Sequence, residues 1–295
     1  MKTRVALAVL TAAALTAAVL AAAVLAGCAS TGPAVARPHP TVARPHPTAT
    51  TVAAYWTEKR LVEAQAWQTG HVPAGLTREE RRALAAIRVG AIFVHEASGN
   101  HFCTASVVTS PDRDLLITAA HCINGGRGGG YRSDIVFIPA YRDGKAPFGV
   151  WTPARLVVAS GWANSSDPAL DVGFVVLKPY QGRNIEDVLG ANTLDFNAGY
   201  RNLVRVTGYP KTTEEPVTCK NWTSEQSATQ LRFDCDGFTG GTSGSPWVTN
   251  FNSVTGTGRI VGVLGGYEEG GDTPDTSYSS YLGSAIHQLY QQAIS

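Results

Sequence analysis

The chain has 295 residues and a formal net charge of +1, with 24 lysines and arginines against 23 acidic residues. This balance lacks the basic excess that is typical of nucleic-acid-binding domains, so we expect no nucleic-acid partner. Apolar residues make up 44% of the chain, which excludes an intrinsically disordered protein.

Residues 1–27 have the pattern of an export signal. Lys2 and Arg4 precede an unbroken run of apolar and small residues, 5–26, and Cys28 follows the run. The ending Leu-Ala-Gly-Cys resembles the lipobox of bacterial lipoproteins, in which the signal is cleaved before a cysteine that is then acylated. The run is also long enough to span a bilayer, so an uncleaved anchor is the alternative. Both interpretations predict a protein tethered to the outer face of the bacterial cell membrane, in the first case through lipid on Cys28.

Residues 28–51 form a tether rich in Pro, Ala and Thr, in which the sequence Val-Ala-Arg-Pro-His-Pro-Thr occurs twice. Such segments cannot bury a core and favour extended polyproline II structure. We interpret His39 and His46, which lie in the two repeats, as solvated spacer residues rather than metal ligands.

Residues 52–88 have a helical rather than an extended pattern. Residues 55–62 are one candidate helix, and Thr77 with Glu80 forms a capping-box signature that opens another. The segment is interpreted either as a propeptide or as an N-terminal extension that packs on the back of the following domain. The sequence does not decide between the two.

From residue 89 to residue 295 the pattern changes to short β-prone runs separated by turn residues. We expect strands at residues 89–94, 102–108, 115–118, 134–138, 155–159, 172–177, 203–206, 230–233, 245–248 and 259–264. Residues 281–294 instead place Leu282, Ile286, Leu289 and Ala293 on one face of a C-terminal helix. The pattern predicts an all-β fold of two six-stranded antiparallel β-barrels with a C-terminal α-helix.

Four cysteines follow Cys28, namely Cys103, Cys122, Cys219 and Cys235. An even number in an exported chain indicates disulfides, for which three pairings are formally possible. The short loops favour the pairs that are sequential along the chain. No cysteine and histidine spacing is typical of zinc, so we expect neither a metal nor a cofactor.

His121 follows the expected strand at residues 115–118 in the sequence Thr-Ala-Ala-His-Cys. A histidine in such a run is usually structural. A histidine held in a tight turn is also suited to act as a general base, provided that a nucleophile lies within hydrogen-bond reach.

Asp171 opens the otherwise apolar run 172–177. A carboxylate at this position is costly unless it is hydrogen-bonded, and orienting an imidazole would supply that bond. A cap at the start of the strand is the alternative interpretation. Asp167, in a Ser-Ser-Asp-Pro turn, is the second candidate for the carboxylate.

Ser243 lies in residues 240–246, which read Gly-Gly-Thr-Ser-Gly-Ser-Pro. Glycines allow consecutive backbone N–H groups to point at one spot, where they can stabilise the oxyanion that forms when a serine attacks a carbonyl. Alone, this stretch could equally be a glycine-rich turn. Combined with a histidine and an aspartate elsewhere, it predicts a nucleophile.

The chain order His121, Asp171, Ser243 and the motifs around these residues resemble those of chymotrypsin-fold serine endopeptidases. Cys103 and Cys122 correspond to the first disulfide of that family. Gly-x-Ser-Gly-Ser-Pro, together with Thr-Gly-Tyr-Pro at residues 207–210, is most similar to the bacterial branch typified by glutamyl endopeptidases.

The resemblance implies a role for each of the motif residues. Ser243 would be the nucleophile, His121 the general base and then the general acid, and Asp171 the residue that orients His121. The backbone N–H groups of Gly241 and Ser243 would form the oxyanion hole. The substrate would be a polypeptide, and we expect a monomer.

Two departures from the family pattern limit which properties of the family the resemblance implies for this chain, namely its activation and its specificity. Thr242 stands where trypsin-like enzymes carry an aspartate, so activation through a buried ion pair with a new N-terminus is not expected. Phe238 and Leu264 stand where glutamyl endopeptidases carry the threonine and histidine that bind the substrate carboxylate. We therefore expect a small or apolar specificity pocket, with preference for a basic side chain through Asp236 as the alternative.

Two other functions compete with a serine endopeptidase. A non-catalytic surface-binding lipoprotein on a protease scaffold would have no reason to keep His121, Asp171 and Ser243 together. An esterase of the α/β-hydrolase type expects Gly-x-Ser-x-Gly and the order Ser, Asp, His, and this chain has neither.

Overall fold

The structure is a computed structural model that describes residues 49–66, 87–253 and 255–295. The predicted signal segment, nearly all of the tether and the helix predicted to open at Thr77 lie outside these residues. Among the helices that the structure describes, none is long and apolar enough to cross a membrane.

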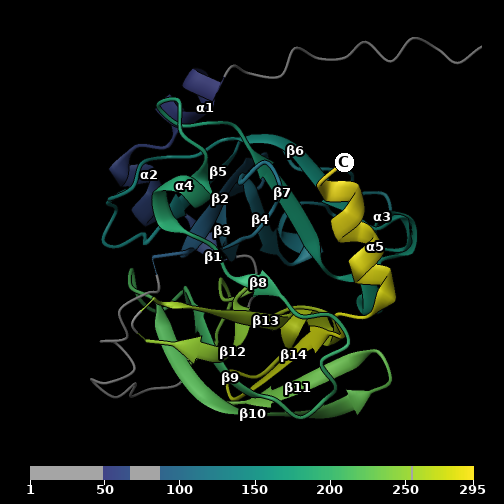
Figure 1. The fold of residues 1–295 in the computed structure, drawn as a ribbon. Helices are drawn as coiled ribbons and strands as arrows, with labels where there is room; N and C mark the ends of the chain where they lie inside the picture. Colours follow the sequence, from purple (N-terminus) through teal and green to yellow (C-terminus); the bar gives the residue numbers. More distant parts are fainter. Residues whose placement is uncertain (1–48, 67–86, 254) are drawn as a thin grey trace, which may run out of the picture. The chain divides into compact units, whose positions relative to one another are not determined.

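The first β-barrel is built from the strands between Val89 and Leu177 (Figure 1). Its antiparallel strands follow the order β5 (Ile135–Pro139), β2 (Val89–Glu96), β3 (Gly99–Val108), β4 (Leu115–Thr118), β7 (Gly173–Leu177) and β6 (Pro153–Val158). The short strand β1 (Gln65–Ala66) pairs with β3 in parallel. Phe137 in β5 and Trp151 exchange two backbone hydrogen bonds of 2.8 and 2.9 Å, which join β5 to the segment that leads into β6.

The second β-barrel is built from the strands between Leu203 and Ser280. Its antiparallel strands follow the order β14 (Thr276–Ser280), β11 (Gln230–Asp234), β10 (Val217–Ser227), β9 (Leu203–Gly208), β12 (Pro246–Asn252) and β13 (Thr257–Val263). The short strand β8 (Thr193–Leu194) joins β13 in parallel. The N–H of Gly265 donates to the carbonyl of Tyr278 at 3.0 Å, which brings the end of β13 back to β14.

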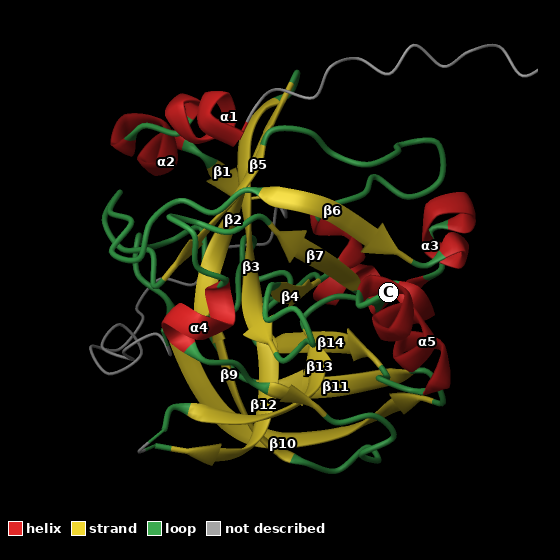
Figure 2. Ribbon diagram, turned by 45° about the horizontal axis from the view of Figure 1, so that its top comes forward, coloured by secondary structure: helices red, strands yellow, loops and turns green. Residues whose placement is uncertain are grey.

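The C-terminal helix α5 (Ser284–Ala293) packs where the two barrels meet (Figure 2). The four apolar residues that the sequence assigns to one face are all buried, and they share a cluster with residues of both barrels such as Phe174 and Ile260. The helix is shorter than predicted, because Gly283 forms its N-cap. The prediction of an all-β fold with two six-stranded barrels and a C-terminal helix is confirmed.

The other helices are short. They are α1 (Ala49–Tyr55), α2 (Glu58–Glu63), α3 (Ser160–Ser165) and α4 (Ile185–Leu189). A helix is present within the predicted range 55–62, but it begins only at Glu58, and a separate helix ends at Tyr55. Helical structure is interrupted at Thr57, which has an extended backbone. The hydroxyl of Thr57 caps α2 by accepting a hydrogen bond from the N–H of Arg60 at 3.4 Å.

The N-terminal segment 49–66 packs on the first barrel. Strand β2 is apolar at nearly every position because both its faces are covered: Ile92 points into the barrel, whereas Phe93 packs against the N-terminal segment. Trp56 lies 5.4 Å from the ring of Phe93, centroid to centroid, and its indole N–H donates to the carbonyl of Asp134 at 3.2 Å. The segment is thus part of the packed domain in this structure.

Replacing Trp56 with alanine is expected to destabilise the domain by about 3 kcal/mol or more, because it removes a buried indole from a packed cluster. Chemical denaturation of the two proteins measures this difference. Lys59→Ala is the matched control, since Lys59 is 82% exposed and its ion pair with Glu63 is a surface pair. An unchanged unfolding midpoint for Trp56→Ala would show that the segment does not stabilise the domain.

Candidate active site

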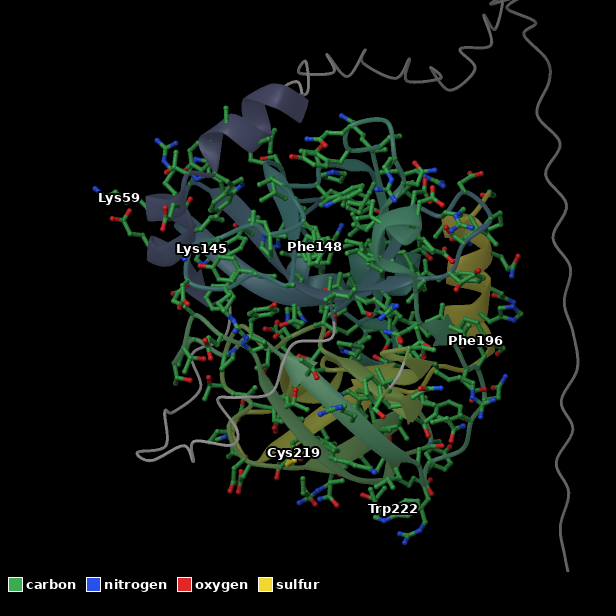
Figure 3. The ribbon with its side chains drawn as sticks, turned by 60° about the vertical axis from the view of Figure 1, so that its left-hand side comes forward. Lys59, Lys145, Phe148, Phe196, Cys219 and Trp222 are labelled. Carbon is green, nitrogen blue, oxygen red and sulfur yellow. A yellow bond between two sulfur atoms is a disulfide. The ribbon has the colours of Figure 1, made fainter. Side chains whose placement is uncertain are left out.

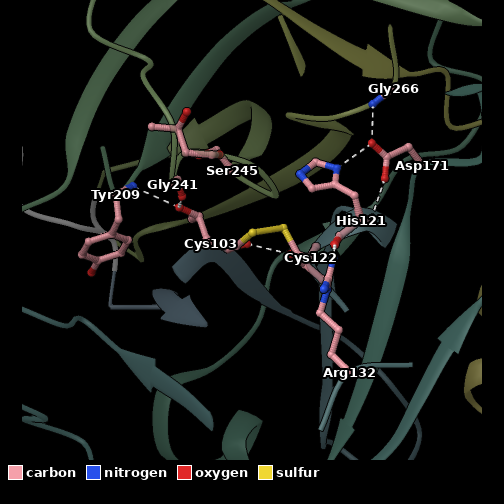
Figure 4. Close-up of a disulfide and its surroundings, with 12 residues drawn as sticks. Cys103, His121, Cys122, Arg132, Asp171, Tyr209, Gly241, Ser245 and Gly266 are labelled. Carbon is pink, nitrogen blue, oxygen red and sulfur yellow. Dashed lines mark hydrogen bonds and ion pairs between the residues drawn. A yellow bond between two sulfur atoms is a disulfide. The ribbon is translucent and has the colours of Figure 1, made fainter. Parts of the chain in front are cut away.

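His121 lies in a short 3-10 helix, Ala120–Cys122, that directly follows strand β4. Cys122 is joined by a disulfide to Cys103 in β3, so the turn that carries the histidine is fixed to the neighbouring strand (Figure 4). The second pair, Cys219–Cys235, is also joined. One imidazole nitrogen and the two sulfur atoms of the first disulfide lie within 4.8 Å of one another, but oxidised sulfurs offer no thiolate to a metal.

The carboxylate of Asp171 binds His121 twice. Its Oδ2 lies 2.8 Å from Nδ1 of the imidazole, and its Oδ1 accepts the backbone N–H of His121 at 2.9 Å (Figure 4). Oδ2 also accepts the N–H of Gly266 at 2.8 Å. The carboxylate is fully buried, and these bonds provide the compensation that such a position requires. The structure therefore brings together the histidine and the aspartate that the sequence predicts, whereas Asp167 caps a turn by accepting the N–H of Ala169.

The pKa of His121 reflects opposing influences. Burial lowers it by disfavouring the charged imidazolium, but the charge and hydrogen bond of Asp171, with a further contribution from Glu269, raise it. Arg132 acts in the lowering direction. The net result is a pKa above the ordinary histidine value. An imidazole in this position is well prepared to accept a proton, because the resulting positive charge is stabilised at Nδ1.

The loop that carries Ser243 is hydrogen-bonded to strand β3 and to the residue after β13, and it lies close to the segment that precedes His121. The carbonyl of Ser243 accepts the N–H of Thr104 at 2.7 Å, and the N–H of Gly244 donates to the carbonyl of Leu264 at 2.6 Å. Gly244 has a φ of +83°, and a Cβ at this position would lie 2.2 Å from the hydroxyl of Thr118 and 3.1 Å from the N of Ala119. Only glycine fits so close to the turn that leads to the histidine.

Gly241 occupies a second position that only glycine fits. Its φ is +94°, and a Cβ would lie 2.3 Å from the ring of Phe102 and 2.6 Å from the carbonyl of Tyr209. The carbonyl of Gly241 accepts the hydroxyl of Thr104 at 3.0 Å, so this peptide is held in a defined orientation. The glycines around the serine are therefore required by close packing as well as by backbone conformation.

Two atoms of this site are buried without a hydrogen-bond partner among the described residues: Nε2 of His121 and Oγ of Ser243. The exposed fraction is 2% for His121 and 0% for Ser243. Buried polar atoms are normally satisfied, so each one without a partner needs an explanation, of which a catalytic role is one. Nε2 of His121 and Oγ of Ser243 are the atoms that would exchange a proton in the predicted serine-histidine pair.

The residues predicted for the specificity pocket differ in burial. Phe238 and Leu264 belong to the apolar cluster inside the second barrel, where Phe238 packs edge-on against Phe233 at 5.9 Å. Asp236 is exposed. Thr242 is fully buried, and its hydroxyl donates to the carbonyl of Thr239 at 2.7 Å, so a neutral side chain is satisfied within the loop.

Arg132 contacts the site and was not predicted from the sequence. Its Nε and Nη2 both donate to the carbonyl of His121, at 3.1 and 3.0 Å (Figure 4). Its Nη1 donates to Oε1 of Glu96 at 2.6 Å. The guanidinium thus connects the backbone of the histidine to strand β2. No sequence signal indicates this contact. Arg132 follows a glycine-rich loop, and the composition of such a loop does not predict its conformation.

Replacing Arg132 with glutamine is expected to lower kcat on a peptide substrate by about tenfold to a hundredfold with little change in KM, because the histidine backbone loses its support. Removing the positive charge should also move the acid limb of the activity profile to higher pH, since that charge lowers the pKa of His121. Steady-state kinetics across pH measures both effects. Arg127→Gln, at an exposed position in the same loop, is the control, and equal effects of the two substitutions would contradict a positioning role for Arg132.

No protein-family model and no curated protein sequence matches the chain. Among solved structures, the protease Anisep from Arthrobacter nicotinovorans is 28% identical with a TM-score of 0.65, and the match covers 72% of this chain and 97% of Anisep. The thermostable serine protease AL20 from an extremophilic microorganism is 29% identical with a TM-score of 0.64, over 70% of this chain and 97% of AL20.

A Glu endopeptidase has the same fold at lower identity. It is 15% identical with a TM-score of 0.56, and the match covers 79% of this chain and 99% of that structure. This likeness concerns the fold alone, whereas the two proteases above 25% identity also support the general kind of protein. The chain therefore has the scaffold of a chymotrypsin-fold serine protease.

Proposed function

We propose that the chain is an exported serine endopeptidase that hydrolyses peptide bonds through an acyl-enzyme on Ser243. The observation that carries the proposal is that Oγ of Ser243 and Nε2 of His121 are both buried without a hydrogen-bond partner in the described part of the chain. The other imidazole nitrogen of His121, Nδ1, lies 2.8 Å from Oδ2 of Asp171. An unsatisfied hydroxyl and an unsatisfied imidazole nitrogen are costly to bury, and catalysis is a reason to keep them.

In the proposed mechanism, Oγ of Ser243 attacks the carbonyl carbon of the scissile peptide bond while Nε2 of His121 takes its proton. Asp171 stabilises the imidazolium through its bond to Nδ1. The backbone N–H groups of Gly241 and Ser243 stabilise the oxyanion. His121 then protonates the leaving amine, and a water activated by the same nitrogen hydrolyses the acyl-enzyme.

The proposed location is the outer face of the bacterial cell membrane, with the N-terminal segment cleaved before Cys28 and that cysteine acylated. The two disulfides support an oxidising compartment outside the cytoplasm. Mass spectrometry of the protein from a bacterial membrane fraction tests the anchor. A mature N-terminus at a residue other than Cys28 would contradict it.

The proposed specificity is for small or apolar side chains. Phe238 and Leu264 are buried in an apolar cluster and can neutralise neither a carboxylate nor an ammonium group. Asp236 is exposed, which disfavours its use at the base of a pocket. A cleavage profile on a peptide library tests this, and dominant cleavage after glutamate, lysine or arginine would contradict it.

The proposed activity is tested with a fluorophosphonate probe, which reacts with activated serines. We expect the full chain, before or after limited proteolysis of its N-terminal part, to gain one probe that peptide mapping locates on Ser243. The non-catalytic alternative predicts no labelling in either form. Labelling of another serine would contradict the assignment of the nucleophile.

A further inference from the structure

The outer face of the second barrel carries a groove of about 860 Å³, formed by strands β9, β10, β12 and β13 and the turns next to them. Four cationic side chains line it: Arg201, Arg205, Lys220 and Arg259. None of the described residues that line the groove is acidic. The whole chain has a net charge of only +1, so this concentration of cations is a local feature.

The strand register places two of these cations directly opposite each other. Arg205 in β9 pairs with Lys220 in β10, so their side chains leave the same face of the sheet. Like charges in directly opposed positions destabilise a sheet, so this pair brings no structural benefit of its own. An anion bound between them would remove the repulsion.

Aromatic rings hold two of the guanidinium groups in place. Arg201 lies over the ring of Trp222 at 4.6 Å, and Arg205 lies over the ring of Phe251 at 4.8 Å. A guanidinium stacked on a ring keeps its N–H edges available for a ligand. Trp222 is 48% exposed, and Figure 3 shows it projecting from the sheet, so the ring supports the arginine without being part of the core.

One carboxylate partly offsets this charge. Asp195 lies 3.3 Å from Arg259, measured between Oδ2 and Nε. The other three cations have no carboxylate within ion-pair distance among the described residues. Neutral polar side chains also line the groove, namely Asn202, Thr218, Thr249, Asn250 and Ser253, together with Leu203, Cys219 and Val248. The charged groups that line the groove are therefore all hydrogen-bond donors.

We propose that this groove binds a linear polymer with repeated phosphate groups and no nucleobases. Several cations spread along one open groove suit a series of anionic groups better than a single ion. Phosphate oxygens accept many bonds at once, from guanidinium groups as well as from neutral donors. None of the lining residues belongs to the candidate active site, so the inference stands independently of the proposed peptidase activity.

The test is isothermal titration of the full-length protein with inorganic polyphosphate, with polyglycerol phosphate and, separately, with inorganic phosphate and polyglutamate. We expect both phosphate polymers to bind, with affinity falling steeply as salt is raised, and single phosphate to bind far more weakly. The polymer that binds more tightly shows whether the groove prefers a chain of linked phosphates or a chain in which glycerol separates the phosphates. Polyglutamate that binds as tightly as the phosphate polymers would overturn the proposal in favour of an acidic peptide.

The double variant Arg205→Gln with Lys220→Gln is expected to lower the affinity for polyphosphate about tenfold or more. Its melting temperature should change little, because the substitutions relieve a repulsive pair but also remove the stacking of Arg205 on Phe251. The control is Lys59→Gln with Arg127→Gln, which changes the net charge equally at exposed positions outside the groove. Equal affinity of the two variants, or no polyphosphate binding by the original chain at low salt, would overturn the proposal. Ser243→Ala should bind the polymer unchanged.

Discussion

Ser243→Ala is expected to lower kcat on a peptide substrate by about 10⁶-fold, to the level left by substrate binding and the oxyanion hole. The substitution removes the only atom that would form the acyl-enzyme and leaves the backbone contacts of the loop, such as the bond from Thr104 to the carbonyl of Ser243, unchanged. Its melting temperature should not fall, because the lost hydroxyl is buried and has no hydrogen-bond partner among the residues that the structure describes. Steady-state kinetics and thermal unfolding measure the two results.

The same loop provides a control for Ser243→Ala. Ser245 is also fully buried, but its hydroxyl donates to the carbonyl of Thr242 at 2.5 Å, so its role is structural. Ser245→Ala should therefore lose stability while retaining kcat within a few-fold. The reverse pattern, with activity lost in Ser245→Ala and retained in Ser243→Ala, would exchange the roles of the two serines.

Several of the strands that the sequence predicts, such as β2, β4 and β5, are apolar because both their faces are covered. In β4, Leu116 packs inside the first barrel, whereas Leu115 and Ile117 face the junction with the second barrel, so the strand is apolar throughout. Strand β10 was missed because most of its residues are exposed and polar. Strand β14 was missed because it is rich in Ser and Thr, although Ser277 and Ser279 are buried.

Some residues of the candidate site can be predicted from the sequence, and others cannot. Side chains that can transfer or stabilise a proton, such as those of His121 and Asp171, can be identified as candidates from residue type alone. The structure brings these two together. Gly266 contributes only a backbone N–H, which every residue except proline carries, so the sequence does not indicate its role. Arg132 acts on a carbonyl eleven positions away through a turn whose path depends on the folded barrel.

Asp171→Asn is expected to lower kcat/KM by about 10⁴-fold, because an amide cannot stabilise the imidazolium and favours the wrong tautomer of His121. The pH profile should change as well. In the original protein, activity should rise with pH as His121 loses its proton, with a midpoint above the ordinary histidine pKa of about 6.5. Burial lowers the pKa of His121, and removing Asp171 takes away the largest opposing influence. The midpoint of the remaining activity should therefore move to lower pH.

Asp167→Asn is the matched control for this prediction. Asp167 lies four positions earlier in the chain and caps the turn at Ala169, a role that asparagine fills equally well. Its activity and pH profile should remain those of the original protein. If Asp171→Asn kept the same midpoint, the titrating group would not be His121, and the base in the mechanism would have to be sought elsewhere. If the midpoint shifts in Asp171→Asn but not in Asp167→Asn, both the rate and the titration depend on the 2.8 Å contact between Asp171 and His121.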